Sequence, residues 1–224
     1  MADWASQQKE YWDSRYRDEA MIWGDRPSAT AHHALRLFRR EGARSVLVPG
    51  SGYGRNTRLF SASGFDVVGV EISPVAVDLA KHHDPSTRFH SGSILDAEIS
   101  GAPFDAIYCF NLLHLFRRDD RLLVVRGFRD LLRDGGTVFL TVFSETEPTF
   151  GKGREVEENT FESKPGRPVH YFTEADMLNH LSGFEIIETG LADDHEDHGE
   201  GPHTHILRYA FARSNERGAS PCAR

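Results

Sequence analysis

Short apolar runs alternate with amphipathic segments along most of the chain. The runs at 44–49, 65–70, 104–110 and 137–143 are rich in Val, Ile, Leu and Phe and have the length of buried strands. A shorter strand is expected near 88–90, and helical segments are expected at about 55–62, 74–81 and 119–132. Strands that alternate with helices form a parallel sheet with crossover helices. The pattern therefore predicts an α/β fold.

The two ends of the chain depart from this alternation. Residues 4–38 read as helices interrupted near Trp23, Gly24 and Pro27, and this segment holds all three tryptophans. Residues 144–171 read as a long irregular segment, of the kind that is usually functional inside a compact domain. A helix begins at Thr173, strands follow at 184–189 and 204–212, and 213–224 reads as a loose tail. We expect one domain over 1–212.

Length, charge and composition limit the functions open to this chain. It has 224 residues, enough for one large domain, and 26 basic residues against 34 acidic ones give a formal charge of −8. Without a basic run, the chain lacks the charge that attracts nucleic acid or anionic lipid. We also find no apolar stretch of about 18 residues and no secretory leader, so we expect a cytoplasmic protein that does not bind a membrane. Its expected oligomeric state is a monomer or a homodimer.

A glycine loop, Gly50-Ser-Gly-Tyr-Gly54, lies between the first predicted strand and helix. Such a loop exposes backbone N–H groups and lets a nucleotide-like ligand approach the backbone closely. The dinucleotide fingerprint G-x-G-x-x-G is not met, because Arg55 occupies the place of its third glycine. Glu71 ends the next strand, where a carboxylate accepts hydrogen bonds from ribose hydroxyls. The order of these features predicts a ribose-containing ligand.

These segments carry a resemblance to a known family. Val46–Gly54 followed by Val68–Ser73 resembles the cofactor motifs of class I S-adenosylmethionine-dependent methyltransferases, and so do Ser91–Asp96, Phe104–His114 and Leu131–Phe139. Within that class, Gly54-Arg-Asn-Thr57 and Trp23–Ser28 are similar to the tellurite-resistance and thiopurine methyltransferase branch. The resemblance implies a Rossmann-like, doubly wound and mostly parallel sheet of seven strands, with an antiparallel last strand and helices on both faces.

The resemblance also implies the cofactor, S-adenosyl-L-methionine, which becomes S-adenosyl-L-homocysteine. The sequence departs from the family pattern in two places. Val48 and Pro49 stand where an acid is common, and Ser93 stands where an Asp often meets the adenine amine. The implied cofactor contacts, together with Trp23 from the aromatic N-terminal segment, are Gly50, Ser51, Gly52, Gly54, Glu71, Ile72, Ser93, Ile94 and Asn111.

The predicted function is S-adenosylmethionine-dependent methyl transfer to a small-molecule acceptor. An acidic chain without an appended recognition domain favours a small acceptor over a protein or nucleic acid, and the narrower resemblance points to a thiol or chalcogen species. Two alternatives stay open. One is a nicotinamide-dependent oxidoreductase, and the other is a non-catalytic module that binds a nucleotide or a metal.

The acceptor is expected outside the carboxyl ends of the parallel strands, where open α/β sheets bind ligands. Segment 144–171 is expected there as a cap, residues 1–40 as a helical lid, and 191–205 as an active-site loop. That loop holds His195, His198, His203 and His205 among carboxylates. It is a solvated acidic loop, a substrate-contacting set in which His203 or His205 acts as a base, or a metal site of His198, His203 and His205.

Further candidates surround the same edge. His170 and Tyr171 are expected either to supply a base or a phenol, or to be a packed aromatic pair. Trp12, His114 and His198 are candidate substrate contacts, with His114 more typical of a wall residue than of a catalyst. Lys152, Arg154, Lys164 and Arg167 either neutralise an anionic substrate or belong to a solvated charged segment.

Overall fold

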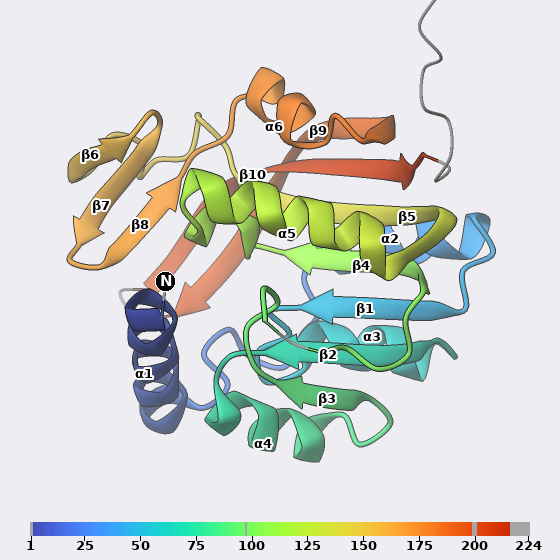
Figure 1. The fold of residues 1–224 in the computed structure, drawn as a ribbon. Coiled ribbons are helices and arrows are strands. Elements are labelled where there is room, and N and C mark those ends of the chain that lie inside the picture. The colour runs from blue at the N-terminus through green and yellow to red at the C-terminus, as the bar shows by residue number, and fades with distance from the viewer. Residues whose placement is uncertain (1, 97, 199–200, 216–224) are drawn as a thin grey trace, which may run out of the picture.

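A twisted seven-stranded sheet forms the centre of the computed structural model, which describes residues 2–96, 98–198 and 201–215 (Figure 1). The strand order is β3-β2-β1-β4-β5-β10-β9. The bounds are β1 Ser45–Pro49, β2 Asp66–Glu71, β3 Arg88–Ser91, β4 Phe104–Phe110, β5 Leu132–Phe143, β9 Phe184–His198 and β10 Gly201–Ser214. β1 to β5 pair in parallel, while β10 is antiparallel to both of its neighbours. The predicted sheet with its antiparallel last strand is confirmed.

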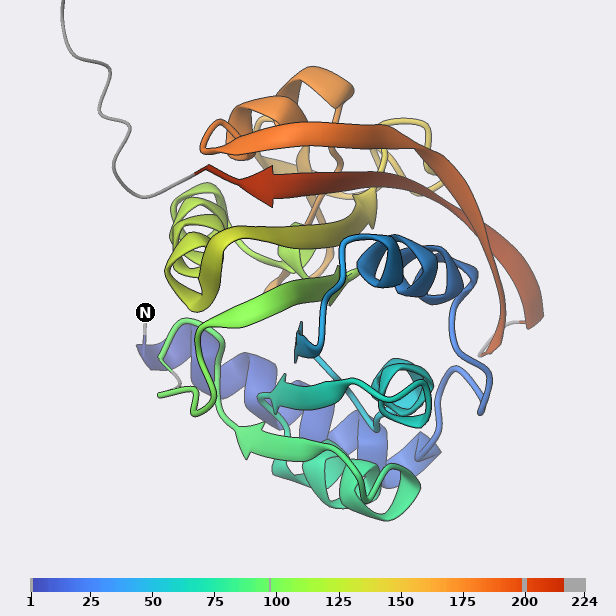
Figure 2. The ribbon, with the colours of Figure 1, turned by 90° about the vertical axis from the view of Figure 1, so that its right-hand side faces the viewer.

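Helices cover both faces of the sheet, as predicted (Figure 2). They are α1 Ala2–Glu19, α2 Ala29–Arg40, α3 Arg55–Ala62, α4 Pro74–His83, α5 Arg118–Leu131 and α6 Glu174–His180, with a short 3-10 helix, η1, at Leu113–Leu115. Because side chains alternate along a strand, Val46 and Val48 pack with α2 and α3, whereas Leu47 packs in the cluster of α5 and α6. The apolar runs in the sequence thus supply two cores, one on each face.

Side-chain caps fix where several helices begin. Ser28, Ser73 and Thr173 accept hydrogen bonds from the N–H groups of Ala31, Ala76 and Asp176, at 3.1–3.2 Å. These bonds satisfy N–H groups that have no partner in the first helical turn. The helix start predicted at Thr173 is confirmed.

The segment expected to be irregular folds into a separate three-stranded sheet. Its strands are β6 Arg154–Glu157, β7 Thr160–Lys164 and β8 Arg167–His170, in the order β6-β7-β8. The prediction of an irregular cap was wrong because two tight turns went unrecognised: Asn159, with φ +54°, follows Glu158, and Gly166, with φ +73°, follows Pro165. Residues that adopt positive φ favour hairpin turns.

Two further boundaries differ from the prediction. Leu132 pairs with Phe104 and Thr137 with Ala106, so the expected glycine turn at 134–136 is a bulge inside β5. The expected loop over 191–205 is a two-stranded ribbon, because β9 continues to His198 and β10 begins at Gly201. Arg213 and Ser214, placed in the tail by the sequence, end β10, and 216–224 lie outside the described residues.

Helix α1 lies across the carboxyl ends of β1, β2 and β3 (Figure 1). Asp13 accepts a hydrogen bond from the Ser73 hydroxyl at the start of α4, and Gln8 donates to the Gly166 carbonyl in the turn between β7 and β8. α2 packs on a face of the sheet instead, so only the first part of the predicted lid over 1–40 lies at that edge. Within the described residues, none of the helices is long and apolar enough to cross a bilayer.

Candidate functional site

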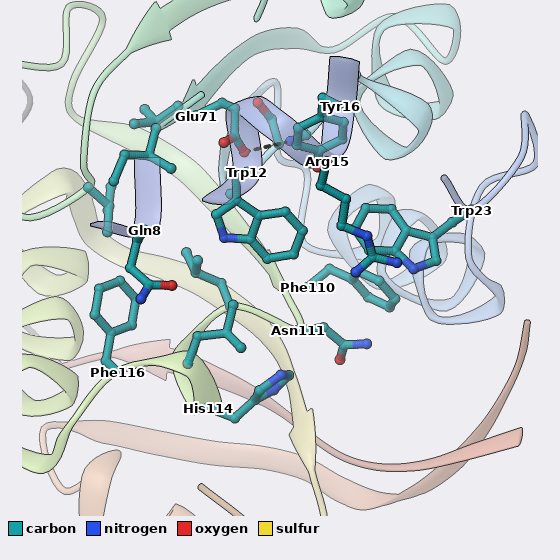
Figure 3. A pocket seen from close by; sticks show the side chains of 18 of the residues that line it. Gln8, Trp12, Arg15, Tyr16, Trp23, Glu71, Phe110, Asn111, His114 and Phe116 are labelled. Carbon is teal, nitrogen blue, oxygen red and sulfur yellow. Dashed lines mark hydrogen bonds between the residues drawn. The ribbon is translucent and has the colours of Figure 1, made fainter. Parts of the chain in front are cut away.

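A cavity of about 280 Å³ opens at the carboxyl edge of the sheet, beneath α1 (Figure 3). Its floor is the loop after β1 and the ends of β2 and β4, and its walls come from α1, η1, β8 and the ribbon of β9 and β10. The predicted cofactor contacts that line it are Trp23, Gly50, Ser51, Gly52, Glu71, Ile72, Ser93, Ile94 and Asn111. The predicted substrate contacts Trp12 and His114 and the predicted base His205 also line it.

The glycine loop and Glu71 form one hydrogen-bonded unit. One carboxylate oxygen of Glu71 accepts from the Gly52 N–H at 3.0 Å, and the other accepts from the Ser73 N–H at 2.9 Å. Burial raises the pKa of this carboxyl, and the two backbone N–H groups only partly offset that effect. Gly52 has φ +54°, and a Cβ there would lie 2.9 Å from the Tyr16 hydroxyl oxygen. Glycine is therefore required both by the backbone conformation and by the approach of α1.

Aromatic side chains enclose the cavity at the α1 side. Trp12 lies with its ring centre 5.9 Å from that of Tyr16 and 6.1 Å from that of Trp23. Trp23 stacks on Tyr53, which is 1% exposed and donates a hydrogen bond to the Gly24 carbonyl at 2.7 Å. These contacts fix the segment between α1 and α2 beside the glycine loop.

Asn111 and His114 bring polar groups from the end of β4. Asn111 has φ +47°, and its side-chain oxygen accepts from the Thr141 hydroxyl at 2.8 Å, so its amide NH₂ is the end that is available to a ligand. His114 is 3% exposed and stacks on Phe143 with ring centres 4.2 Å apart. Burial lowers the pKa of His114 to about 3, and its Nδ1 has no hydrogen-bond partner among the described residues. At neutral pH it is an uncharged imidazole.

His205 faces the same chamber from β10. Its ring stacks on Phe143 at 4.8 Å, and its Nδ1 lies 3.0 Å from a Glu147 oxygen. Burial disfavours the charged imidazole, but the hydrogen bond and charge of Glu147 outweigh burial, and the pKa of His205 is raised. Behind it, burial and the charge of Glu196 raise the pKa of Asp194 to about 6.

Three of the predicted catalytic residues are not among those that line the cavity. His170 is buried, with its Nδ1 2.8 Å from the Thr160 hydroxyl and its Nε2 2.6 Å from Asp176. The Tyr171 hydroxyl donates to Thr149. The ring of His170 packs against Phe172 and that of Tyr171 against Phe143 and Phe161, so both side chains lie between the small sheet and the main body. His203 lies on the ribbon beside His205, at 4.8 Å between ring centres.

Two other predicted positions also lie elsewhere. Gly54 packs under the loop, where a Cβ would lie 3.2 Å from the Thr57 hydroxyl, and it does not line the cavity. The side chain of His198 lies outside the described residues.

The sequence reasoning missed several lining residues, chiefly on α1. Trp4 and Gln8 were missed there, and with Trp12 and Tyr16 they follow one another at intervals of four, which places all four on one face of a helix. That spacing could have predicted that one face of this helix lines a site. Arg15 also lines the cavity. Arg167 was considered as an anion-neutralising residue and does line the cavity, with its guanidinium 3.8 Å from the centre of the Tyr11 ring. Glu196 also lines the cavity and was not among the predicted site residues, because it is one of several acids in its segment.

Comparison with known proteins finds a domain of known type over β1 to the first part of β5. Residues 46–136 match the family model described as a methyltransferase domain. Over 131 residues the chain is 30% identical to a glycine/sarcosine N-methyltransferase of Parasynechococcus marenigrum, with 55% of this chain and 46% of that protein covered. Over 115 residues it is 32% identical to a ubiquinone biosynthesis O-methyltransferase of Xanthomonas campestris, with 49% and 46% covered. The chain spans about half the length of these relatives.

A solved structure shares nearly the whole fold. The Burkholderia thailandensis 1,6-didemethyltoxoflavin-N1-methyltransferase, solved with 1,6-didemethyltoxoflavin and S-adenosylhomocysteine, superposes with a TM-score of 0.71. The superposition covers 96% of this chain and 90% of that one at 23% identity. The likeness extends to α1 and the strands after β5. The narrower resemblance to the tellurite-resistance and thiopurine branch stays a prediction.

Proposed function

Because the chain contains a class I S-adenosylmethionine-dependent methyltransferase domain, we propose that it transfers the methyl group of S-adenosylmethionine to a small-molecule acceptor. The observation that carries this proposal is the buried Glu71 carboxylate, fixed by Gly52 and Ser73 in a cavity that continues into a chamber of aromatic and imidazole side chains. A ribose site and an acceptor site therefore share one enclosed space, as a direct transfer requires.

The residues present fit the cofactor. Gly50 and Gly52 form a cradle that side chains would fill, since a Cβ on Gly50 would lie 3.0 Å from Leu112. Each Glu71 oxygen accepts one backbone hydrogen bond, which leaves acceptor capacity for ribose hydroxyls. Ile72 and Ile94 offer apolar surface for the adenine ring, and Asn111 offers an amide donor. When bound, the cofactor supplies a methyl group on a positively charged sulfur.

On the acceptor side, the chain has to hold the nucleophile in line and keep water out. Trp12, His114 and Phe143 enclose that side of the cavity, and His205 contributes a polar edge. We assign Trp12 and His114 to acceptor binding. Nδ1 of His114, which makes no hydrogen bond to any residue that the structure describes, gives a ligand a buried polar partner. The side chain of His198, a predicted acceptor contact, carries no part of this assignment.

A thiol or chalcogen species is the first acceptor to test, because the Gly54-Arg-Asn-Thr57 segment is similar to that branch. The acidic charge of the chain supports an acceptor other than nucleic acid. A cytoplasmic location and a monomeric or homodimeric state stay predictions.

Ligand binding and turnover test the proposal together. Thermal unfolding is measured with S-adenosylmethionine, S-adenosylhomocysteine and NAD, and release of S-adenosylhomocysteine is then measured over a panel of thiols, chalcogen oxyanions, amines and phenols. A ligand at about 100 times its Kd adds roughly 2.7 kcal/mol, which is on the order of 5–10 °C for a domain of this size. We expect both sulfur ligands to raise Tm and one acceptor class to turn over. A shift with NAD alone would favour the oxidoreductase, and binding without turnover of any acceptor would favour a non-catalytic module.

A further inference from the structure

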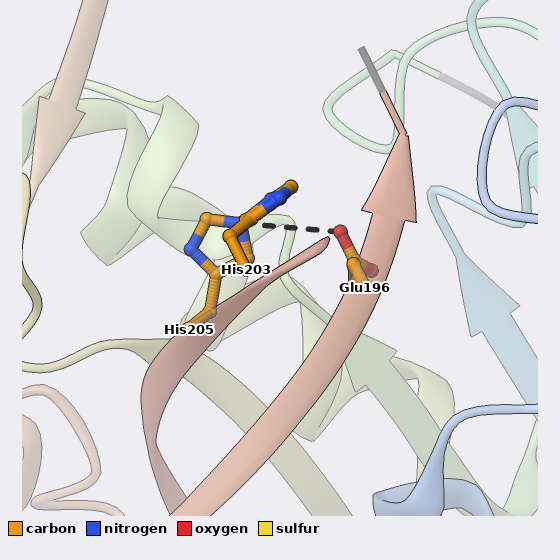
Figure 4. Close-up of side chains that lie close together, drawn as sticks. All are labelled: Glu196, His203 and His205. Atoms are coloured by element: carbon orange, nitrogen blue, oxygen red, sulfur yellow. Dashed lines mark ion pairs between the residues drawn. The ribbon is translucent and has the colours of Figure 1, made fainter. Parts of the chain in front are cut away.

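We propose that Glu196, His203 and His205 bind a divalent transition-metal ion of the zinc type in the wall of the cavity. One carboxylate oxygen and two imidazole nitrogens from these residues lie within 4.8 Å of one another (Figure 4). The sequence favoured no metal here and named His198, with His203 and His205, as the alternative set. The fold brings Glu196 to these two histidines instead.

Strand pairing explains the convergence. In the ribbon, His203 pairs with Glu196 and His205 pairs with Asp194. Residues two apart on a strand point to the same face, and paired residues on neighbouring strands share that face. Two imidazoles and two carboxylates are therefore gathered on one side of a rigid two-stranded element.

In both rings a hydrogen bond through Nδ1 fixes the tautomer. His203 Nδ1 lies 2.9 Å from the Gly201 carbonyl oxygen, which only accepts, so Nδ1 carries the proton. His205 Nδ1 lies 3.0 Å from the carboxylate of Glu147, whose side chain is 1% exposed. A neutral imidazole held as a donor through Nδ1 presents a lone pair at Nε2, and metal-binding histidines are commonly oriented in this way by a carboxylate or a backbone carbonyl.

Within the described residues, the carboxylates of Glu147, Asp194 and Glu196 outnumber the one guanidinium, that of Arg55, around the cluster. Arg55 holds one oxygen of Glu196 at 3.2 Å, and the other oxygen lies 3.9 Å from His205 Nε2. Asp194, opposite His205, is 5% exposed, and its Oδ2 has no hydrogen-bond partner among the described residues. This buried oxygen is an independent sign that a positive group belongs on this face, because a buried carboxylate oxygen normally has a partner.

Two imidazoles and one carboxylate suit Zn²⁺ and neighbouring first-row ions. Metal–ligand distances of about 2.0–2.2 Å place ligand atoms about 3.3–3.6 Å apart in a tetrahedral site. Since the three atoms lie within 4.8 Å of one another, the side chains must close by up to about 1.5 Å. Since Glu196 and His205 line the cavity, a fourth position would face the acceptor. The use of that position for a thiolate or an oxygen acceptor rests on the proposed methyl transfer, whereas metal binding does not.

The test is calorimetric titration with Zn²⁺ after the protein has been dialysed against a chelator and the chelator removed. We expect one ion per chain. We also expect His203→Ala, His205→Ala and Glu196→Gln each to weaken binding by about 100-fold or more. Glu147→Gln, which keeps all three proposed ligands but replaces the acceptor of His205 Nδ1 and of the Ile206 N–H, should weaken binding by about 10–100-fold. His195→Ala is the matched control, because this exposed histidine lies on the same ribbon with its Nδ1 on Thr204.

The results separate the two proposals. No bound Zn²⁺ in the wild type, or unchanged affinity in the His203, His205 and Glu196 variants, would overturn the metal site. Equal losses in His195→Ala would overturn it too, since binding would then be non-specific. If an alanine variant does not fold, the glutamine variant of the same histidine is titrated in its place. S-adenosylhomocysteine is titrated into the same set in the absence of metal: its failure to bind the wild type counts against the proposed function and leaves the metal result standing.

Discussion

Replacing Glu71 with glutamine tests the ribose site with a change of one atom. In the wild type, the two carboxylate oxygens accept from Gly52 at 3.0 Å and Ser73 at 2.9 Å. An amide supplies one acceptor, so its NH₂ must face one of these N–H groups, and leaving that buried group unsatisfied costs about 1–3 kcal/mol of stability. A ribose hydroxyl loses a charged acceptor as well, worth about 1–2 kcal/mol. We therefore expect Glu71→Gln to weaken S-adenosylhomocysteine binding by on the order of 5–30-fold.

Isothermal titration with S-adenosylhomocysteine measures this loss, and urea unfolding measures the change in stability separately. Glu188→Gln is the matched control, because Glu188 is a carboxylate of similar bonding on β9, paired with His33 and Tyr209 and not among the residues that line the cavity. Its variant should bind the ligand as the wild type does. A folded Glu71→Gln protein whose Kd stays within about twofold of the wild-type value would refute the assignment of Glu71 to the ribose.

Three further changes test the fold around the site. Gly52→Ala places a Cβ 2.9 Å from the Tyr16 hydroxyl oxygen at a residue with positive φ. We expect urea unfolding to show a loss of about 1–2 kcal/mol in the free energy of unfolding, and titration to show weaker S-adenosylhomocysteine binding. If both values stay unchanged, the loop geometry is contradicted. Gly127→Ala lies inside α5 with no atom within 4 Å of the new Cβ, and should gain about 0.5–1 kcal/mol; destabilisation would show that the helix surface is not open there. Asp176 is partly buried, but hydrogen bonds from His170 and His180 outweigh the effect of burial and hold the pKa of its carboxyl well below 3.8. Because the pKa of Asp176 is lower in the folded state than in the unfolded state, its contribution to stability is complete above the unfolded-state pKa. That contribution is lost as the pH falls. The wild type should therefore lose about 1–2 kcal/mol more than Asp176→Asn between pH 6 and pH 3, and parallel stability curves would refute the pairing.

The elements that the sequence predicted best are those whose signals are local. The helix at 55–62 and the strand at 104–110 were predicted with their observed bounds, because glycines or polar residues border a run of one clear period. The small sheet of β6, β7 and β8 was missed because its strands are short and polar, with exposed positions such as Glu155 and Lys164. Their pairing is set by two turns and by contact with α1, and contact with a distant segment leaves no periodic signal.

The residues of the site were likewise predicted where the signal is local in the sequence and missed where it is not. Glu71 and the glycines were found because the strand, the loop and the acid are adjacent in the sequence, and the cavity includes nearly all of that set. His170 looked equally promising, but its role depends on Asp176 and on Thr160, which reaches it through the pairing of β7 with β8. Gln8 and Arg15 were missed because they line the cavity only when α1 crosses the sheet. The contacts of such residues follow from tertiary packing rather than from their neighbours in the sequence.

The histidine-rich ribbon shows how strand direction brings chemistry to this edge. β10 runs antiparallel to β5, and Leu207 pairs with Phe143, the last residue of β5. Residues 201–206 therefore extend past the end of β5 with β9 as their pairing strand, beside the carboxyl edge where the cavity lies. If β10 were parallel to β5, its carboxyl end would lie at this edge, and the histidines near its amino end would lie at the opposite edge of the sheet. Within the described part of the chain, no further strand lies beside residues 201–206 on the side away from β9. Arg55 and Glu147 instead hold Glu196 and His205 by hydrogen bonds, so the contacts that stabilise the ribbon also position two of the three proposed metal ligands.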